Sequence, residues 1–210
     1  VHNNLQQLEH IYLKNLYVHD IVGHMGTSTG SSRKESKTTG GIFFAVEGKT
    51  ENIATEPKFS DILVEGCTIA NVDRTAIDLY DLFGGPSIWD YYADGSGSYD
   101  QIIDPANVEI MGTDIIIRNN TVYEIGGDGI VSLYSNNPLI EYNVAWEIST
   151  KATDSSANTW TWQCEDAIFQ YNEAYLTRQP APTNNDGMAW DADFGRRTVY
   201  QYNYSHDNEG

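Results

Sequence analysis

Acidic side chains that could carry chemistry gather in two short segments near the end of the chain. One segment reads Trp160-Thr-Trp-Gln-Cys-Glu165 and the other reads Met188-Ala-Trp-Asp-Ala-Asp193. Successive side chains of a β-strand point to opposite faces, so Asp191 and Asp193 share one face. Two carboxyl groups about 5 Å apart suit a retaining glycosidase, and a separation of about 6.5–9.5 Å suits an inverting one. Such oxygen ligands also suit Ca²⁺.

The alignment of the two segments decides which acids meet, because stacked strands are about 4.8 Å apart. We align Trp160 with Met188, which points both of these apolar side chains inward and places Glu165 beside Asp193 on the outer face. Like charges at that distance must share a proton, bind a cation or move apart. We therefore predict Glu165, Asp191 and Asp193 as the catalytic acids. The alternative is a solvated acidic face.

The acidic segments belong to a repeat that runs through the chain. Six segments share an apolar alternation followed by Asn or Gly and a second apolar pair, and they begin at residues 11, 62, 115, 138, 167 and 198. The intervals between them are 51, 53, 23, 29 and 31 residues. A period of roughly 20–50 residues is typical of solenoids. The first two intervals are about twice the third, so each contains either a degenerate coil or a long loop.

A second strand pattern lies between these segments, usually opened by a small residue, as in Gly41-Ile-Phe-Phe44 and Gly129-Ile-Val-Ser132. No sustained helical period intervenes, which argues against alternating strands and helices. A sandwich would show hairpin turns, whereas this chain has one recurring longer loop. The pattern predicts an all-β parallel solenoid with coils of 23–31 residues and long loops.

Asn residues recur where the repeats turn a corner. Side-chain amides stacked along a solenoid axis bond to one another and to backbone groups that a corner leaves unpaired. We therefore expect structural roles for four of them, Asn119, Asn143, Asn172 and Asn203.

The two cysteines, Cys67 and Cys164, lie at least two predicted coils apart. Two coils rise about 9.6 Å, and a disulfide spans at most roughly 7 Å between Cα atoms. Both are predicted to be free thiols, buried or nearly so.

Charge excludes two classes of partner. The 210 residues include 12 Lys and Arg against 30 Asp and Glu, a formal net charge of −18. Nucleic acids and anionic membrane surfaces are bound by clustered basic residues, so we predict neither partner. No apolar stretch approaches the roughly 18 residues of a membrane span, which predicts no membrane insertion. The chain shows no signal-peptide pattern at its start.

The whole chain resembles the right-handed parallel β-helix proteins of the pectate-lyase-like superfamily, which are secreted carbohydrate-active proteins. The resemblance is strongest from about residue 115 to residue 210, in the segments 119–130, 186–193 and 201–210. It implies a right-handed β-helix and a secreted or cell-surface location. The chain ends inside a repeat-like segment without a cap, so we expect residues 1–210 to be a single domain and a fragment of a longer solenoid.

The resemblance also suggests roles for basic residues. Lyases of this fold commonly use a basic residue to remove the proton next to a uronate carboxyl group, often with Ca²⁺ present. Arg196 or Arg197 is the candidate for that role, with Arg196 preferred as support for the acidic centre. Otherwise one of the two arginines pairs with Asp191 or Asp193 and orients it. Arg178 and His206 are candidates for substrate binding, and the near-neutral pKa of imidazole also suits His206 to act as a general base. If a metal is bound, Asp191 and Asp193 are its expected ligands.

Aromatic residues crowd a Gly-rich stretch in the middle of the chain. Trp89, Tyr91 and Tyr92 are candidates for a sugar-binding platform, because a pyranose presents apolar C–H faces to a ring. The alternative is a loop that packs these rings on its own coil.

Two function hypotheses remain. The leading one is a secreted enzyme that cleaves a polysaccharide or oligosaccharide in an acidic groove on the β-helix face, by hydrolysis or, second, by Ca²⁺-assisted elimination. The negative charge favours a neutral glycan, since a polyuronate would need Ca²⁺ as a bridge. The alternative is a non-catalytic glycan-binding or adhesive module of a larger surface protein, in contact with further coils of the same or another chain.

Overall fold

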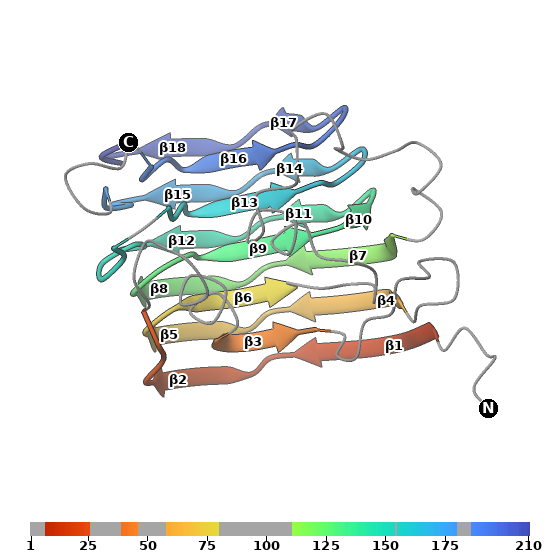
Figure 1. Cartoon of the computed structure of the whole chain (residues 1–210), viewed down its shortest axis with the longest axis horizontal. Helices are drawn as coiled ribbons and strands as arrows, with labels where there is room; N and C mark the ends of the chain where they lie inside the picture. Colours follow the sequence, from red (N-terminus) through yellow and green to blue (C-terminus); the bar gives the residue numbers. More distant parts are fainter. Residues whose placement is uncertain (1–6, 26–38, 46–57, 80–110, 154, 180–185) are drawn as a thin grey trace, which may run out of the picture.

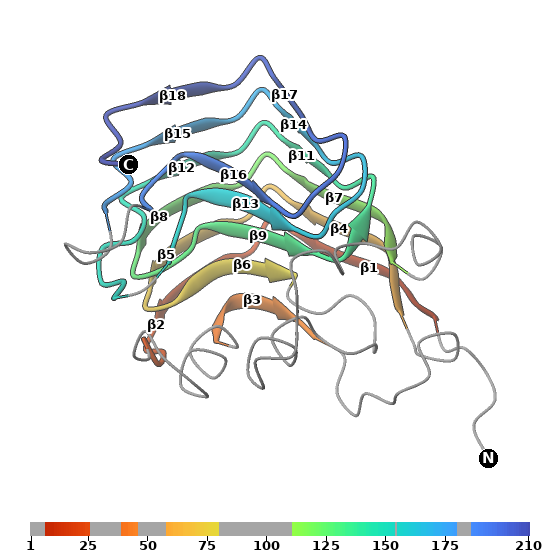
Figure 2. The same ribbon diagram turned by 45° about the horizontal axis from the view of Figure 1, so that its top comes forward.

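The computed structural model describes residues 7–25, 39–45, 58–79, 111–153, 155–179 and 186–210. Over these residues the chain is a stack of coils whose strands form three parallel sheets (Figure 1). The first five coils each contribute a strand to all three sheets in turn, and the last described coil contributes to the first two, so the coils stack along a single axis (Figure 2). No helix in the described ranges is long and apolar enough to cross a membrane.

The strands of each sheet follow one another in spatial order. The first sheet contains β1 (Gln7–Lys14), β4 (Lys58–Glu65), β7 (Gly112–Arg118), β11 (Leu139–Glu141), β14 (Ile168–Gln170) and β17 (Val199–Gln201), with β10 (Ser135–Asn136) also paired to β7. The second contains β2 (Tyr17–Ile21), β5 (Thr68–Val72), β8 (Thr121–Ile125), β12 (Val144–Trp146), β15 (Glu173–Tyr175) and β18 (Tyr204–His206). The third contains β3 (Gly40–Phe44), β6 (Thr75–Leu79), β9 (Ile130–Leu133), β13 (Thr159–Trp162) and β16 (Trp190–Asp193).

This architecture confirms the predicted right-handed parallel β-helix and decides between the two explanations of the long intervals. Ile11 pairs with Ile62, and Ile62 pairs with Ile115, so β1, β4 and β7 lie in successive coils. Each long interval is therefore one coil that carries additional chain, and no degenerate coil lies between them.

The core consists of apolar columns that run along the axis. Val64, Ile117, Ile140 and Phe169 are successive register partners on the first sheet, and all four are fully buried. Complete burial of such a side chain contributes about 1.5–3 kcal/mol. Because each coil covers the apolar residues of the next, the coils stabilise one another as neighbours.

An asparagine ladder occupies the corner between the first and second sheets. The Oδ1 atom of Asn143 accepts hydrogen bonds from the backbone and side-chain nitrogens of Asn120, at 3.0 and 2.9 Å. Asn172 accepts the same pair from Asn143, and Asn203 accepts it from Asn172. The ladder was predicted correctly for three residues and wrongly for Asn119. That residue precedes the ladder position and takes a left-handed φ of 55°, a conformation that Asn tolerates.

Both cysteines are free and buried, as predicted. Burial raises the pKa of the Cys164 thiol to about 12, although it lies close to the Ser135 backbone N–H. Cys67 takes the ladder position of its own coil, where its backbone N–H donates to Oδ1 of Asn120 at 2.9 Å.

Candidate active site

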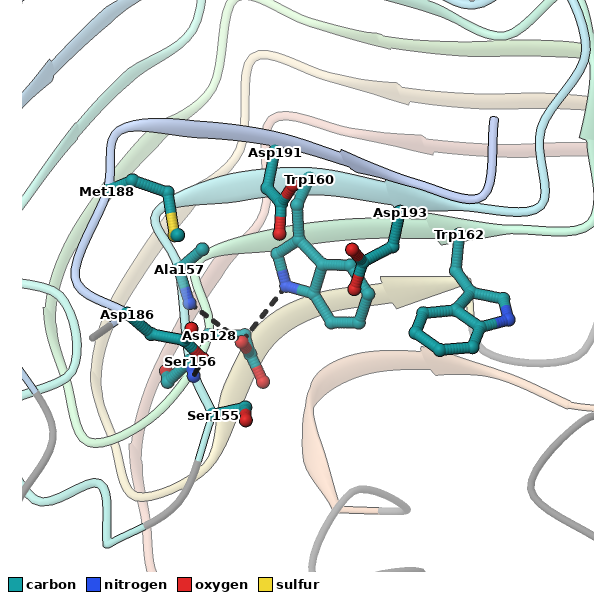
Figure 3. A pocket seen from close by; sticks show the side chains of 10 residues that line it. All are labelled: Asp128, Ser155, Ser156, Ala157, Trp160, Trp162, Asp186, Met188, Asp191 and Asp193. Carbon is teal, nitrogen blue, oxygen red and sulfur yellow. Dashed lines mark hydrogen bonds between the residues drawn. The ribbon is translucent and has the colours of Figure 1, made fainter. Parts of the chain in front are cut away.

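A pocket of about 320 Å³ opens on the outer face of the third sheet (Figure 3). Its volume lies within the range of sites that hold small ligands, roughly 300–1,000 Å³. Three successive coils supply the lining, through the turn before β9, the approach to β13, and β16 with the segment before it. The described lining residues are Asp128, Ser155, Ser156, Ala157, Trp160, Trp162, Asp186, Met188, Asp191 and Asp193.

The register of β13 and β16 brings aromatic and acidic side chains together. Trp160 is the Cα partner of Asp191, and Trp162 is the partner of Asp193. The predicted alignment of Trp160 with Met188 is therefore wrong by three residues. An odd shift exchanges the two faces of a strand, so the two indoles lie on the outer face with the acids. They are buried there, in a small apolar cluster with Val131 and Leu133. The prediction that Asp191 and Asp193 share an outer face is confirmed.

Glu165 is not beside Asp193, because it forms a parallel bridge with Arg196. The Arg196 Nε donates to Glu165 at 2.6 Å, and Arg197 forms an ion pair with the same carboxylate. Only 1% of the Glu165 side chain is exposed. The structure thus places Glu165 and Arg196 together outside the described lining of the pocket, and Arg196 pairs with neither Asp191 nor Asp193 in the interactions that hold it there.

Asp191 has a perturbed carboxyl group. Burial raises the pKa of Asp191 above its ordinary value, and the negative charge of Asp186 raises it further. A hydrogen bond from the Ala192 backbone N–H, at 2.8 Å, acts in the opposite direction. Asp186 accepts a 2.9 Å bond from the Ser156 backbone N–H. Figure 3 shows Asp186 on the Met188 side of the Trp160 indole and Asp193 on its Trp162 side.

Asp128 is a buried member of the lining, and its carboxylate is already hydrogen-bonded. Its Oδ1 accepts from the Trp160 indole N–H at 2.9 Å and from the Ala157 backbone N–H at 3.1 Å. Its Oδ2 pairs with the Arg74 guanidinium at 3.0 Å, and both side chains are buried. Because the Asp128 carboxylate already bonds to these three donors, we assign it a structural role in the lining and not the role of proton donor.

The other predicted substrate-binding residues lie elsewhere or outside the description. Arg178 forms an ion pair with Glu209 at 2.8 Å. His206 bonds to Asp207 and Glu173, and these bonds raise the pKa of its imidazole. Neither Arg178 nor His206 belongs to the described pocket lining. Trp89, Tyr91 and Tyr92 lie outside the described residues.

For a metal, the described part of the chain offers no cluster of three or more His, Cys, Asp or Glu side chains arranged to hold an ion. Asp191 and Asp193 are thus without a third ligand of these types among the described residues.

Sequence reasoning missed the pocket roles of Asp128, Trp160 and Trp162, although a signal for them exists. On the first sheet Ile168 pairs with Val199, an interval of 31 residues. Adjacent coils of equal length keep one interval on all three sheets, and the same interval joins Trp160 to Asp191. Carrying the repeat interval from the first sheet to the third would have placed the two indoles beside the acids.

Comparisons with known proteins point to one class of enzyme. The chain is 31% identical over 222 aligned positions to the lacto-N-biosidase of Bifidobacterium longum subsp. longum. It is 28% identical to the crystal structure of the native GH136 lacto-N-biosidase from Eubacterium ramulus, with a TM-score of 0.66, and its selenomethionine derivative gives 0.64. The matches cover 96% and 99% of this chain, but the chain spans only 13% of the curated relative and 32% of the solved one. No family model matches the chain.

Proposed function

We propose that this chain carries the catalytic pocket of a glycoside hydrolase that acts on a lacto-N-bioside. The observation that carries the proposal is the pocket on the third sheet, in which the carboxyl groups of Asp186, Asp191 and Asp193 meet the Trp160 indole. The likeness to lacto-N-biosidases supports this reaction and substrate. The names of these relatives support an oligosaccharide as the substrate. The location outside the cell is our proposal from the β-helix resemblance alone.

Asp193 is the carboxylate that we assign to the anomeric carbon, as nucleophile or as the base that activates water. Glycoside hydrolysis needs one ionised carboxylate and one protonated carboxyl group on either side of the scissile bond. Asp193 is on the same strand face as Asp191 and on the other side of the Trp160 indole from Asp186 (Figure 3). Asp193 is therefore the acid that pairs with the proton donor in either case, whether the donor is Asp186 or Asp191.

The proton donor is one of the two remaining acids. The raised pKa of Asp191 favours it, because burial holds the proton on this carboxyl group to a higher pH than usual, which suits its transfer to the glycosidic oxygen. Its position across the indole favours Asp186. In either case the proton passes to the leaving oxygen as the C–O bond breaks, and the leaving sugar departs as a neutral alcohol.

The lining supports hydrolysis over elimination. None of the ten described lining residues is basic, whereas β-elimination from a uronate needs a base beside the sugar carboxylate. Arg196, the expected base, is occupied by the buried Glu165. An acidic pocket also repels a uronate and admits a neutral sugar more readily.

Incubation of the purified chain with a nitrophenyl lacto-N-bioside tests the proposal. We expect nitrophenol release, and we expect Asp193→Asn to lower kcat by about 100-fold or more. Asp166→Asn is the matched control, because Asp166 pairs with Arg197 away from the pocket lining and should keep its rate. Binding of the glycoside without release of nitrophenol would contradict the hydrolase proposal and support a binding module.

The leaving group identifies the donor. Nitrophenolate leaves with little protonation, whereas a sugar alkoxide must be protonated. Replacing the true donor by Asn should therefore preserve much of the rate on the nitrophenyl glycoside and abolish it on an oligosaccharide that ends in the same disaccharide. The corresponding substitution of the other acid, Asp186 or Asp191, should affect both substrates alike.

A further inference from the structure

A buried chain of polar contacts runs along the solenoid axis beneath the pocket. It begins at Arg74, which is fully buried in the turn between β5 and β6, and passes to Asp128 in the turn between β8 and β9. Asp128 then accepts the indole N–H of Trp160 on β13. The three residues come from three successive coils and end at the register partner of Asp191.

The backbone fixes the two turns against each other. The Gly127 N–H donates to the Arg74 carbonyl at 2.8 Å, and the Ala76 N–H donates to the Asp128 carbonyl at 3.1 Å. A Cβ added at Gly127 would lie 1.9 Å from the Arg74 guanidinium, so a residue without a side chain is required for this approach. Arg74 and Asp128 therefore have little freedom to separate.

The energetics make Asp128 a rigid anchor. A buried carboxylate is tolerated only when it is paired and hydrogen-bonded, and Arg74 supplies the compensating charge. A buried indole N–H likewise needs an acceptor, and the Asp128 carboxylate provides one. Rotation of the Trp160 ring would leave the indole N–H without this acceptor, whereas Asp128 would keep Arg74 and the Ala157 N–H. The ring is thus held in one orientation on the outer face, next to Asp191 and between Asp186 and Asp193 (Figure 3).

We infer that Asp128 is a positioning residue: neutralised by Arg74, it holds the Trp160 indole as the fixed aromatic wall against which the sugar lies. This inference rests on the proposed function only for its kinetic consequence. The indole wall contacts the sugar in both the ground state and the transition state, so loss of its anchor should appear mainly in KM.

Two variants and their combination test the inference. Trp160→Phe keeps a ring but removes the N–H donor, and it leaves Asp128 paired with Arg74 and with the Ala157 N–H. We expect it to lower kcat/KM about tenfold through KM, the scale of a lost hydrogen bond to a charged group. Asp128→Asn should lower kcat/KM by a similar factor. Because both substitutions remove the same hydrogen bond, the double variant should lose no more kcat/KM than the more impaired of the two single variants. Trp146→Phe, in the stacked column of the second sheet, is the matched control and should leave KM unchanged.

A readout without substrate separates this inference from the hydrolase proposal. The Trp160 indole N–H, assigned by its absence in Trp160→Phe, should exchange slowly with solvent in the wild-type chain and faster in Asp128→Asn. Rapid exchange in the wild type would overturn the inference even if the variant does not fold. Unchanged exchange in a folded Asp128→Asn chain, or additive kinetic losses in the double variant, would overturn it as well. An inactive wild-type chain with the expected exchange pattern would contradict only the proposed reaction.

Discussion

Trp160 and Asp191 are direct register partners on adjacent coils, so an indole and a carboxyl group lie side by side on the outer face of the β-helix. The neighbouring ring excludes water from one side of the carboxyl group, and burial is the main reason why the pKa of Asp191 is raised. One register thus supplies both the aromatic wall and the perturbed acid of the pocket.

Replacing Asp191 by Asn should stabilise the fold at neutral pH. The ordinary pKa of Asp191 is 3.8, and burial raises it in the folded chain. The folded chain is therefore most stable when Asp191 is protonated, below the unfolded pKa, and it loses that stability as pH rises through the folded pKa. Asp191→Asn should therefore melt at a higher temperature than the wild type at pH 7 and at the same temperature near pH 3.

Asp166→Asn provides the control of opposite sign. Its hydrogen bond to Arg197 lowers the pKa of Asp166, so this carboxylate contributes stability above the unfolded pKa that is lost as pH falls through the folded pKa. The control should melt at a lower temperature than the wild type at pH 7. Equal behaviour of the two variants across pH would refute the burial argument.

Asn143→Ala should strongly destabilise the solenoid. The side chain accepts two hydrogen bonds from Asn120 and donates to Asn172 and to the Ile117 carbonyl. Buried groups left without partners cost about 1–3 kcal/mol each, so we expect a loss of at least about 3 kcal/mol in urea denaturation. Gln201→Ala, which removes one exposed bond to Gln170, should cost less than about 0.5 kcal/mol.

Glu165→Gln should change stability and not catalysis. The substitution removes the buried charge that binds Arg196 and Arg197, and both guanidinium groups reach solvent, so the loss of unfolding free energy should be about 2 kcal/mol. The folded variant should keep the kcat and KM of the wild type on the nitrophenyl glycoside. A 100-fold fall in kcat would instead show that Glu165 takes part in catalysis.

Neither cysteine should react in the native chain. Cys164 is fully buried and its pKa is raised to about 12, so almost no thiolate is present at pH 8. Mass spectrometry after iodoacetamide treatment should find no adduct in the folded protein and two adducts after denaturation without reductant. One adduct or none in the denatured sample would reveal a disulfide or another modification.

The sequence was sufficient for the coils because apolar periodicity and corner residues repeat in every one of them. The predictions from the sequence that were wrong all concern the register between neighbouring coils. Asn119 and Asn120 are adjacent amides, and only stacking against Asn143 decides which one enters the ladder. The same uncertainty misplaced Glu165, since a three-residue error in aligning β13 with β16 carries a side chain from one face to the other.

The role of Asp128 required information that periodicity does not contain. Asp128 follows a Gly-Gly turn and reads as an ordinary turn residue, while its role depends on Arg74, a residue 54 positions earlier in the sequence. Trp160 and Trp162 read as core residues because outward indoles in an aromatic pocket are as apolar as inward ones. The 31-residue interval to Asp191 and Asp193 distinguishes the two orientations, and the hydrogen bond from the Trp160 indole to Asp128 agrees with it.

The rate of nitrophenol release by the wild type and by Asp193→Asn shows whether the acids beside Trp160 hydrolyse a glycosidic bond. We expect turnover by the wild type, a fall of about 100-fold or more in Asp193→Asn, and partial recovery when azide replaces the missing carboxylate. A folded Asp193→Asn chain that turns over at the wild-type rate would contradict it.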